Sequence, residues 1–301
     1  MYFDLAQVPF KGRLLVCDMD GTLLNSSSKI SEGNIKALER FVAGGGMFTV
    51  ATGRMERSVV PYLDVLPVNV PAIVYNGAAI YDFKTENILW QADLDTAVAK
   101  AVGDAMARFP EISVQVYHGG RTYFVCENEH SEAHRIREHL EPVRTDLDGV
   151  PAPWFKIIIA WDPPKLKEVE EFLRGYELGG GGVAGKGSGA ATKGCDTAIS
   201  GRAAFRQVYS EPQFLELLNP SATKGSALKV LTGILGIDRT CVVSMGDNLN
   251  DMELIQEAGT GIAVANAHNT LKAAASMCCT DHDNDAVSEV ICWLENGRIL
   301  L

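Results

Sequence analysis

The sequence predicts an α/β fold: a doubly wound, parallel-sheet (Rossmann-like) core with an inserted α+β cap domain. Strand and helix patterns alternate over roughly the first 80 residues and again over roughly the last 80, while the segment between them lacks this alternation. Strand–helix–strand units of this kind imply parallel strands joined by right-handed crossovers. The 301 residues also exceed the usual length of a single domain.

The N-terminal part of the core is expected to contain three strands and two helices. Its predicted strands are 13–18, 47–52 and 71–75, and its predicted helices are 31–43 and 55–66. In the first helix, Ile35, Leu38 and Val42 recur at helical spacing, Ser31 suits the N-cap, and three consecutive glycines follow the last turn.

The C-terminal part of the chain repeats the alternation. Helices are predicted over 224–235, 250–258 and 285–294, and strands over 240–245 and 261–265. Together the two ends predict a core domain formed by residues 1–82 and 218–301.

The middle, residues 83–217, is predicted to be an inserted α+β cap. Two strands, 114–117 and 121–126, flank His118-Gly119-Gly120, which is typical of a hairpin. A strand over 154–161 lies between helices over 129–140 and 164–174. A cap of this size is expected to determine substrate specificity.

One low-complexity stretch, 179–189, nearly matches the phosphate-binding pattern GxxxxGK[ST]. Gly187 stands where that pattern needs a hydroxyl, and no buried strand leads directly into the stretch. Its composition favours a flexible loop over a nucleotide site.

Composition limits the classes of partner. The content of 47% hydrophobic and 22% charged residues fits a globular protein, and the net charge of −11 argues against general binding to nucleic acid. No apolar run is long enough for a membrane span, and the N-terminus does not resemble a signal peptide. The seven scattered cysteines form no CxxC pair, which argues against structural zinc and fits the reducing cytoplasm. We therefore expect a cytoplasmic protein with no membrane or nucleic-acid partner.

Polar residues gather where the predicted parallel strands end, which is where such sheets bind ligands. Each of them has an ordinary explanation: a turn, a helix N-cap, a favourable helix dipole or a solvated lysine. Those explanations do not account for several strand ends that bring carboxylates and hydroxyls to one edge. The residues concerned are Asp18, Asp20, Thr52, Gly53, Asn76, Lys224, Asp247, Asn250 and Asp251.

Four carboxylates at one edge need a cation, and hard oxygen ligands with open positions suit Mg²⁺. The four are Asp18, Asp20, Asp247 and Asp251. Lys224, the Thr52 hydroxyl and backbone N–H groups near Gly21 and Gly53 can bind phosphate oxygens. A carboxylate held on the metal can attack phosphorus, and a neighbour driven towards its protonated form can act as a general acid. The pattern therefore predicts phosphoryl transfer through an aspartate.

The same residues resemble the four ordered motifs of the haloacid dehalogenase-like phosphatases, and most closely the Cof-type branch. The matching stretches are Asp18-Met19-Asp20-Gly21-Thr22-Leu23, Thr52-Gly53-Arg54, Lys224-Gly225 and Gly246-Asp247-Asn248-Leu249-Asn250-Asp251. In that branch the cap is inserted between the second and third motifs. The cap of this chain matches no motif of the family.

The resemblance implies a role for each residue. Asp18 is expected to be the nucleophile, and Asp20 the general acid and then the base. Mg²⁺ is expected on Asp18, the backbone carbonyl of Asp20 and Asp247, with Asp251 close by. Thr52, Gly53 and Lys224 are expected to bind the phosphoryl group, with Asn250 nearby. Asp20 favours a phosphatase, because the dehalogenases of the family lack this second aspartate.

The resulting hypothesis is a Mg²⁺-dependent phosphomonoester hydrolase that acts on a small phosphorylated metabolite, with sugar phosphates as the favoured class. A phosphomutase or phosphotransferase resembling phosphomannomutase is the alternative, because it shares the first motif and the position of the cap. A catalytically silent binding module is a third interpretation, although all four motifs are present.

Overall fold

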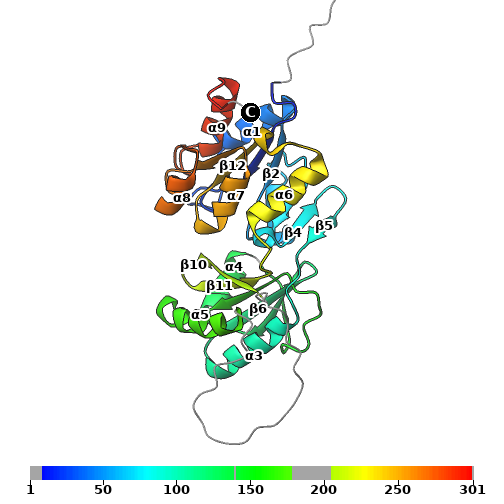
Figure 1. Ribbon diagram of the computed structural model, residues 1–301, viewed down its shortest axis with the longest axis vertical. Helices are drawn as coiled ribbons and strands as arrows, with labels where there is room; N and C mark the ends of the chain where they lie inside the picture. The colour runs from blue at the N-terminus through cyan, green and yellow to red at the C-terminus, as the bar shows by residue number, and fades with distance from the viewer. Residues whose placement is uncertain (1–8, 139, 178–204, 300–301) are drawn as a thin grey trace, which may run out of the picture. The chain divides into compact units, whose positions relative to one another are not determined.

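The computed structural model describes residues 9–138, 140–177 and 205–299 (Figure 1). The chain divides into two compact units, Met1–Gln91 with Ser221–Leu301 and Ala92–Pro220. The glycine-rich stretch 179–189, for which a flexible loop was expected, lies outside the described residues. No helix in the described ranges is long and apolar enough to cross a lipid bilayer.

The first unit contains a five-stranded sheet in which every neighbouring pair is parallel. Strand β1 (Leu14–Cys17), which lies between β12 and β2, is buried, as the apolar run before Asp18 predicts. Because β12 lies directly beside β1, the carboxyl ends of these two strands are adjacent. The order is β14 (Met277–Cys278), β13 (Thr260–Ala263), β12 (Val242–Gly246), β1 (Leu14–Cys17) and β2 (Met47–Val50).

Helices from both ends of the chain complete this unit. Helix α1 (Glu32–Ala43) starts at the predicted N-cap, where the Ser31 hydroxyl accepts a bond from the backbone of Asn34, and it packs against α9 (Ala286–Glu295). Helix α6 (Lys224–Leu235) has the predicted bounds and packs against α7 (Met252–Glu257) (Figure 1). The short helix α8 (Asn269–Ala274) follows β13. A buried cluster joins α6 and α7 to the sheet through Leu14, Val16, Val242, Leu228, Leu231 and Leu254.

The third predicted strand forms in place but pairs differently from the prediction. Strand β3 (Ala72–Val74) packs beside β2 but pairs with the parallel sheet through a single bridge, between Ala51 and Ile73. Its main partner is β4 (Ala79–Asp82), which runs antiparallel and forms a hairpin with β5 (Asn87–Gln91). This pairing keeps the chain in the first unit as far as Gln91 rather than residue 82. At the other boundary between the units, strand β11 (Phe214–Leu218) belongs to the second unit, which extends to Pro220.

The second predicted helix, 55–66, is wrong in its length. Helix α2 covers only Glu56–Val59 and is followed by the 3₁₀ turn η1 (Val60–Tyr62). Pro61 has no backbone N–H and its ring crowds the preceding turn, so an α-helix does not continue through it. A similar irregularity precedes α7, where the 3₁₀ turn η4 (Leu249–Asp251) occupies the start of the predicted helix 250–258.

The second unit is built on a six-stranded mixed sheet. All its pairs are antiparallel except β7 with β8. The predicted hairpin between β6 and β7 is confirmed, and both of its glycines, Gly119 and Gly120, have positive φ. The sheet order is β10 (Arg206–Glu211), β11 (Phe214–Leu218), β9 (Lys156–Ala160), β6 (Ser113–His118), β7 (Arg121–Cys126) and β8 (Pro142–Arg144).

The two faces of this sheet differ in chemistry. One face carries the apolar cluster that includes Val114, Ile157 and Leu215, and helices α3 (Ala97–Arg108) and α5 (Pro163–Glu177) contribute Val102 and Leu166 to that cluster. The opposite face, here called the polar face, carries Gln115, Tyr117, Lys156 and Glu216, all of them buried. Helix α4 (Glu129–Arg137) reaches it through His134, whose Nδ1 lies 2.9 Å from the Oε1 of Gln115. This unit is the α+β insertion that the sequence predicts within an α/β core.

Candidate active site

Asp18 lies where the buried strand β1 ends. Its backbone N–H donates to the carbonyl of Met245 at 3.0 Å, which extends the pairing of β1 with β12 by one residue. The residue is 5% exposed, and its Oδ1 accepts a bond from the Nζ of Lys224 at 2.6 Å. The strand therefore delivers a carboxylate into a buried, charged environment.

Lys224 is the first residue of α6, and its side chain is fully buried. Its Nζ donates to Oδ1 of Asp18 and to Oδ1 of Asp251, at 2.6 Å in each case. Gly77 packs closely against the start of α6. It has a φ of +90°, and a Cβ there would lie 2.2 Å from the backbone of Thr223. Lysine thus joins two carboxylates that come from different strand ends.

Asp247 and Asp251 follow β12. The Oδ2 of Asp251 accepts bonds from the backbone N–H groups of Asp247 at 3.0 Å and Asn248 at 3.2 Å, which orders this turn. The Thr22 hydroxyl donates to Oδ1 of Asp247 at 3.3 Å. One carboxylate oxygen from each of Asp18, Asp247 and Asp251 lies within 4.8 Å of the others.

The electrostatics of this cluster fit a bound cation. Burial raises the pKa of Asp18 well above its ordinary range, while Lys224 opposes the shift and Asp251 adds to it. Burial, followed by the charge of Asp251, raises the pKa of Asp247 to about 6. Burial alone would lower the pKa of Lys224, but Asp18 and Asp251 outweigh it and raise that pKa. Three carboxylates thus share one ammonium group, and a divalent cation would relieve their remaining repulsion.

Asp20 does not join this cluster, although four converging carboxylates were expected. Its side chain is 57% exposed and forms a bidentate pair with Arg54, with Nε–Oδ2 at 2.8 Å and Nη2–Oδ1 at 2.7 Å. Arg54 follows β2, so its fork reaches Asp20 from the neighbouring strand end and holds the carboxylate there. Three carboxylates converge, and the fourth is held by arginine.

Arg54 belongs to the matching stretch Thr52-Gly53-Arg54, but the sequence alone assigned it no role. Its guanidinium also lies over the ring of Tyr62, 5.5 Å from the ring centre. An arginine one residue beyond a polar strand end is the signal that could have identified it.

Asn76, which follows β3, contacts three of the four expected phosphate-binding residues: Thr52, Gly53 and Asn250. The Thr52 hydroxyl accepts a bond from the backbone N–H of Arg54 at 3.1 Å. The Nδ2 of Asn250 donates to Oδ1 of Asn76 at 3.0 Å. At Gly53, a Cβ would lie 3.0 Å from the Asn76 amide, so glycine allows this close approach. Among the described residues the buried Oδ1 of Asn250 has no hydrogen-bond partner, which fits a group whose partner is a bound ligand.

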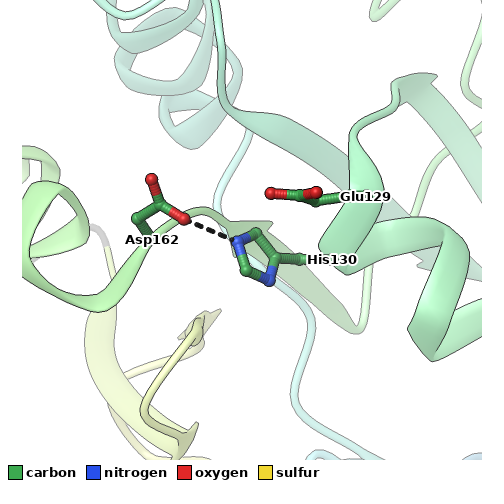
Figure 2. Close-up of side chains that lie close together, drawn as sticks. All are labelled: Glu129, His130 and Asp162. Atoms are coloured by element: carbon green, nitrogen blue, oxygen red, sulfur yellow. Dashed lines mark hydrogen bonds and ion pairs between the residues drawn. The ribbon is translucent and has the colours of Figure 1, made fainter.

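A second group of possible metal ligands lies in the other unit. Figure 2 shows Glu129 and His130 at the start of α4 facing Asp162, which precedes α5, and their ligand atoms lie within 4.8 Å of one another. His130 Nε2 is 3.1 Å from Oδ1 of Asp162, and the ammonium of Lys165 is 3.4 Å from its Oδ2. None of the three residues of this second group is buried, whereas Asp18 and Asp251 are, so the Asp18 cluster is the better candidate metal centre.

Comparison with known proteins agrees with this geometry. The family model of the haloacid dehalogenase-like hydrolases matches residues 15–181 and 187–291. The chain belongs to this family. A haloacid dehalogenase-like hydrolase from Bacteroides thetaiotaomicron has a similar structure, with a TM-score of 0.77 and 27% sequence identity over 96% of this chain and 100% of that one.

Two bacterial relatives are phosphatases and match over nearly their whole length. One is a 5-amino-6-(5-phospho-D-ribitylamino)uracil phosphatase of Bacillus subtilis, 25% identical over 95% of this chain and 99% of its own length. The other is a pyridoxal phosphate phosphatase of Escherichia coli, 24% identical over 93% of this chain and 97% of its own length. The expectations of the Cof-type branch, of its α/β fold with a cap, and of an enzyme of the phosphatase type are confirmed.

Proposed function

We propose that the protein is a Mg²⁺-dependent phosphomonoester hydrolase that works through an aspartyl-phosphate intermediate. The observation that carries this proposal is the buried cluster in which Lys224 joins Asp18 to Asp251 beside Asp247. It combines a candidate nucleophile, a phosphate-binding cation and a set of hard oxygen ligands at one sheet edge.

In the proposed first step, a carboxylate oxygen of Asp18 attacks the phosphorus of the ester. The bond between phosphorus and the ester oxygen breaks, and protonated Asp20 gives its proton to the departing oxygen. Asp20 must therefore leave Arg54 before it acts, because both of its carboxyl oxygens accept bonds from the guanidinium. Lys224 and Thr52 would stabilise the oxygens of the transferring phosphoryl group.

In the second step, the Asp20 carboxylate takes a proton from water, and the oxygen of that water attacks the aspartyl phosphate. The bond between phosphorus and Asp18 breaks, inorganic phosphate leaves, and both aspartates return to their starting forms. Asp18, Asp247, Asp251 and the backbone carbonyl of Asp20 would hold Mg²⁺, with Asn250 close to this set. The bound ion would offset the negative charge that an anionic substrate adds to these carboxylates.

A small phosphorylated metabolite is the proposed substrate, with sugar phosphates as the favoured class. The two relatives named above act on a phosphorylated ribityl compound and on pyridoxal phosphate, which are both small esters. The groups of the first unit recognise features that every such ester shares. We therefore propose that the second unit selects the leaving group, and that the enzyme works in the cytoplasm.

The direct test measures inorganic phosphate released from a panel of phosphorylated metabolites, with Mg²⁺ or with excess EDTA. Wild type should turn over at least one ester with Mg²⁺ and none with EDTA. Asp18→Asn should fold normally, judged by circular dichroism, and release no phosphate. Undiminished turnover in EDTA, or near-full activity of folded Asp18→Asn, would refute the mechanism. Turnover that needs a sugar bisphosphate would instead identify a phosphomutase.

A further inference from the structure

We infer that Asn266 is a positioning residue that holds the loop after β1 at a fixed distance from the loop after β12. This inference rests on the proposed function, because the two loops carry the proposed metal ligands. The observation behind it is a short segment after β13 that hydrogen-bonds to both loops. It lies outside the four motifs that the sequence analysis identified.

The loop after β1 is a tight turn that lies against the Asp247 carboxylate. Gly21 has a φ of +80°, and a Cβ there would lie 2.5 Å from Oδ2 of Asp247. The backbone N–H groups of Thr22, Leu23 and Leu24 all donate to the carbonyl of Met19, at 3.4, 3.0 and 2.8 Å. The tight turn therefore presses the backbone next to Asp20 against the Asp247 carboxylate, where a small displacement changes the spacing of the proposed ligands.

The segment after β13 hydrogen-bonds both to the loop after β1 and to the loop after β12. The Nδ2 of Asn266 donates to the carbonyl of Gly21 at 2.7 Å. Two residues later, the backbone N–H of His268 donates to the carbonyl of Asp247, also at 2.7 Å. A span of three residues thus links the carbonyl of Gly21, the residue after Asp20, to the carbonyl of Asp247.

A second segment holds Asn266 and the far end of the same loop. The backbone N–H of His282 donates to Oδ1 of Asn266 at 3.1 Å, and the His282 Nδ1 lies 3.0 Å from the carbonyl of Leu24. Asp283 accepts two bonds from Ser26, from its backbone N–H at 2.8 Å and from its hydroxyl at 2.6 Å. The loop is therefore held at Gly21, Leu24 and Ser26, each time by this pair of segments.

Groups that orient metal ligands from outside commonly change metal affinity by about 10–100-fold when they are removed. Asn266 is exposed, so water can replace part of its hydrogen bond, and the lower end of that range is the better expectation. Asn266→Ala should raise the Mg²⁺ concentration for half-maximal activity by about 10-fold. Activity at saturating Mg²⁺ should stay close to that of wild type, because none of the proposed catalytic groups is removed.

The experiment compares wild type, Asn266→Ala and Asp283→Ala with the control Asn284→Ala. Asn284 lies in the same surface turn as Asp283, but within the described part of the chain its side chain bonds to Asp281 and not to the loop after β1. Mg²⁺ binding is measured by calorimetry with the metal alone, alongside the Mg²⁺ dependence of phosphate release and the melting temperature without metal. Asn266→Ala should bind Mg²⁺ more weakly, at an unchanged metal-free melting temperature, while the control binds it like wild type.

Two results would overturn the inference. One is Mg²⁺ binding by folded Asn266→Ala within about twofold of wild type, and the other is an equal loss in Asn284→Ala. If Asn266→Ala does not fold, Mg²⁺ binding by Asp283→Ala tests the inference instead. Asp283 is exposed, and its substitution removes the two bonds that hold the same loop at Ser26. A wild-type protein that neither binds Mg²⁺ nor releases phosphate would instead refute the proposed function.

Discussion

Lys224 offsets negative charge at the strand ends, because its buried ammonium group bonds to the carboxylates of both Asp18 and Asp251. Preorganised charged groups of this kind typically contribute about 10²–10³-fold to turnover. Lys224→Ala should therefore lower kcat by about that factor, measured by phosphate release at saturating Mg²⁺. Lys229→Ala, an exposed change in the same helix, is the matched control and should act like wild type. Equal activity of the two variants would contradict the role given to Lys224.

Asp247 makes the stability of the metal-free protein depend on pH. Burial raises its pKa from the ordinary 3.8 to about 6, so the folded protein keeps the proton where the unfolded chain has lost it. The stability from this group is fully present below pH 3.8 and is lost as pH rises through about 6. Asp18 shifts in the same direction.

Denaturant unfolding of the chelated protein between pH 4 and 7 tests this expectation, with Asp247→Asn as the reference. The stability of wild type should fall relative to the variant as pH rises through about 6, and Mg²⁺ should restore much of the loss. A stability difference that stays constant over this range would show that Asp247 ionises normally in the fold.

At the scale of elements, the turn that follows β3 fixes the start of α6. Gly77 has a φ of +90°, and a Cβ would lie 2.2 Å from the carbonyl carbon of Thr223. Gly77→Ala should destabilise the protein by about 1–3 kcal/mol and also lower kcat, since Lys224 lies at that helix start. Gly233→Ala, in an exposed and uncrowded position of the same helix, should instead stabilise it by roughly 0.5–1 kcal/mol. Thermal melts and phosphate release separate the two outcomes.

The elements that could be predicted from sequence are those whose signals are local. Helix α6 begins and ends where its apolar spacing predicts, and the hairpin after β6 forms at Gly119 and Gly120. Strands β10 and β11 escaped prediction, as did β5, on which Ile88 and Leu89 are exposed at a sheet edge. Their formation depends on partners that are distant in sequence, or on a hairpin whose turn has no glycine.

In the candidate site, too, some features follow from local sequence signals and others depend on contacts between distant residues. Polar strand ends can be read from sequence, so the meeting of Asp18, Asp247 and Asp251 follows once β1 and β12 are neighbours. The pairing of Asp20 with Arg54 could not be read in this way, because it depends on which way two side chains turn after their strands end. The contact of Asn266 with Gly21 joins residues 245 positions apart, and no local sequence pattern predicts it.

At the scale of the whole molecule, the two units divide the chemistry of the proposed reaction. The first unit holds the groups that would bind metal and phosphoryl oxygens. The second has its own apolar cluster on one side of its sheet and, on the other, the polar face with the buried ion pair of Lys156 and Glu216. The Nζ of Lys156 is 3.1 Å from Oε1 of Glu216 and lies over the ring of Tyr117. Buried charges of this kind are costly to maintain, which favours a role beyond stability.

We predict that the polar face selects the leaving group. Glu216→Gln keeps the size of the side chain and removes its charge, so it should change the ratio of kcat/KM between two metabolite esters by about 10-fold, or ~1.4 kcal/mol. Hydrolysis of p-nitrophenyl phosphate, whose leaving group offers little to recognise, should change far less, and the Mg²⁺ requirement should remain. Arg174→Ala is the control, because Arg174 lies on α5, which packs on the opposite face, and its side chain is 58% exposed. An equal loss on every ester would show that Glu216 supports only the fold of the second unit, and selectivity would then have to come from other residues.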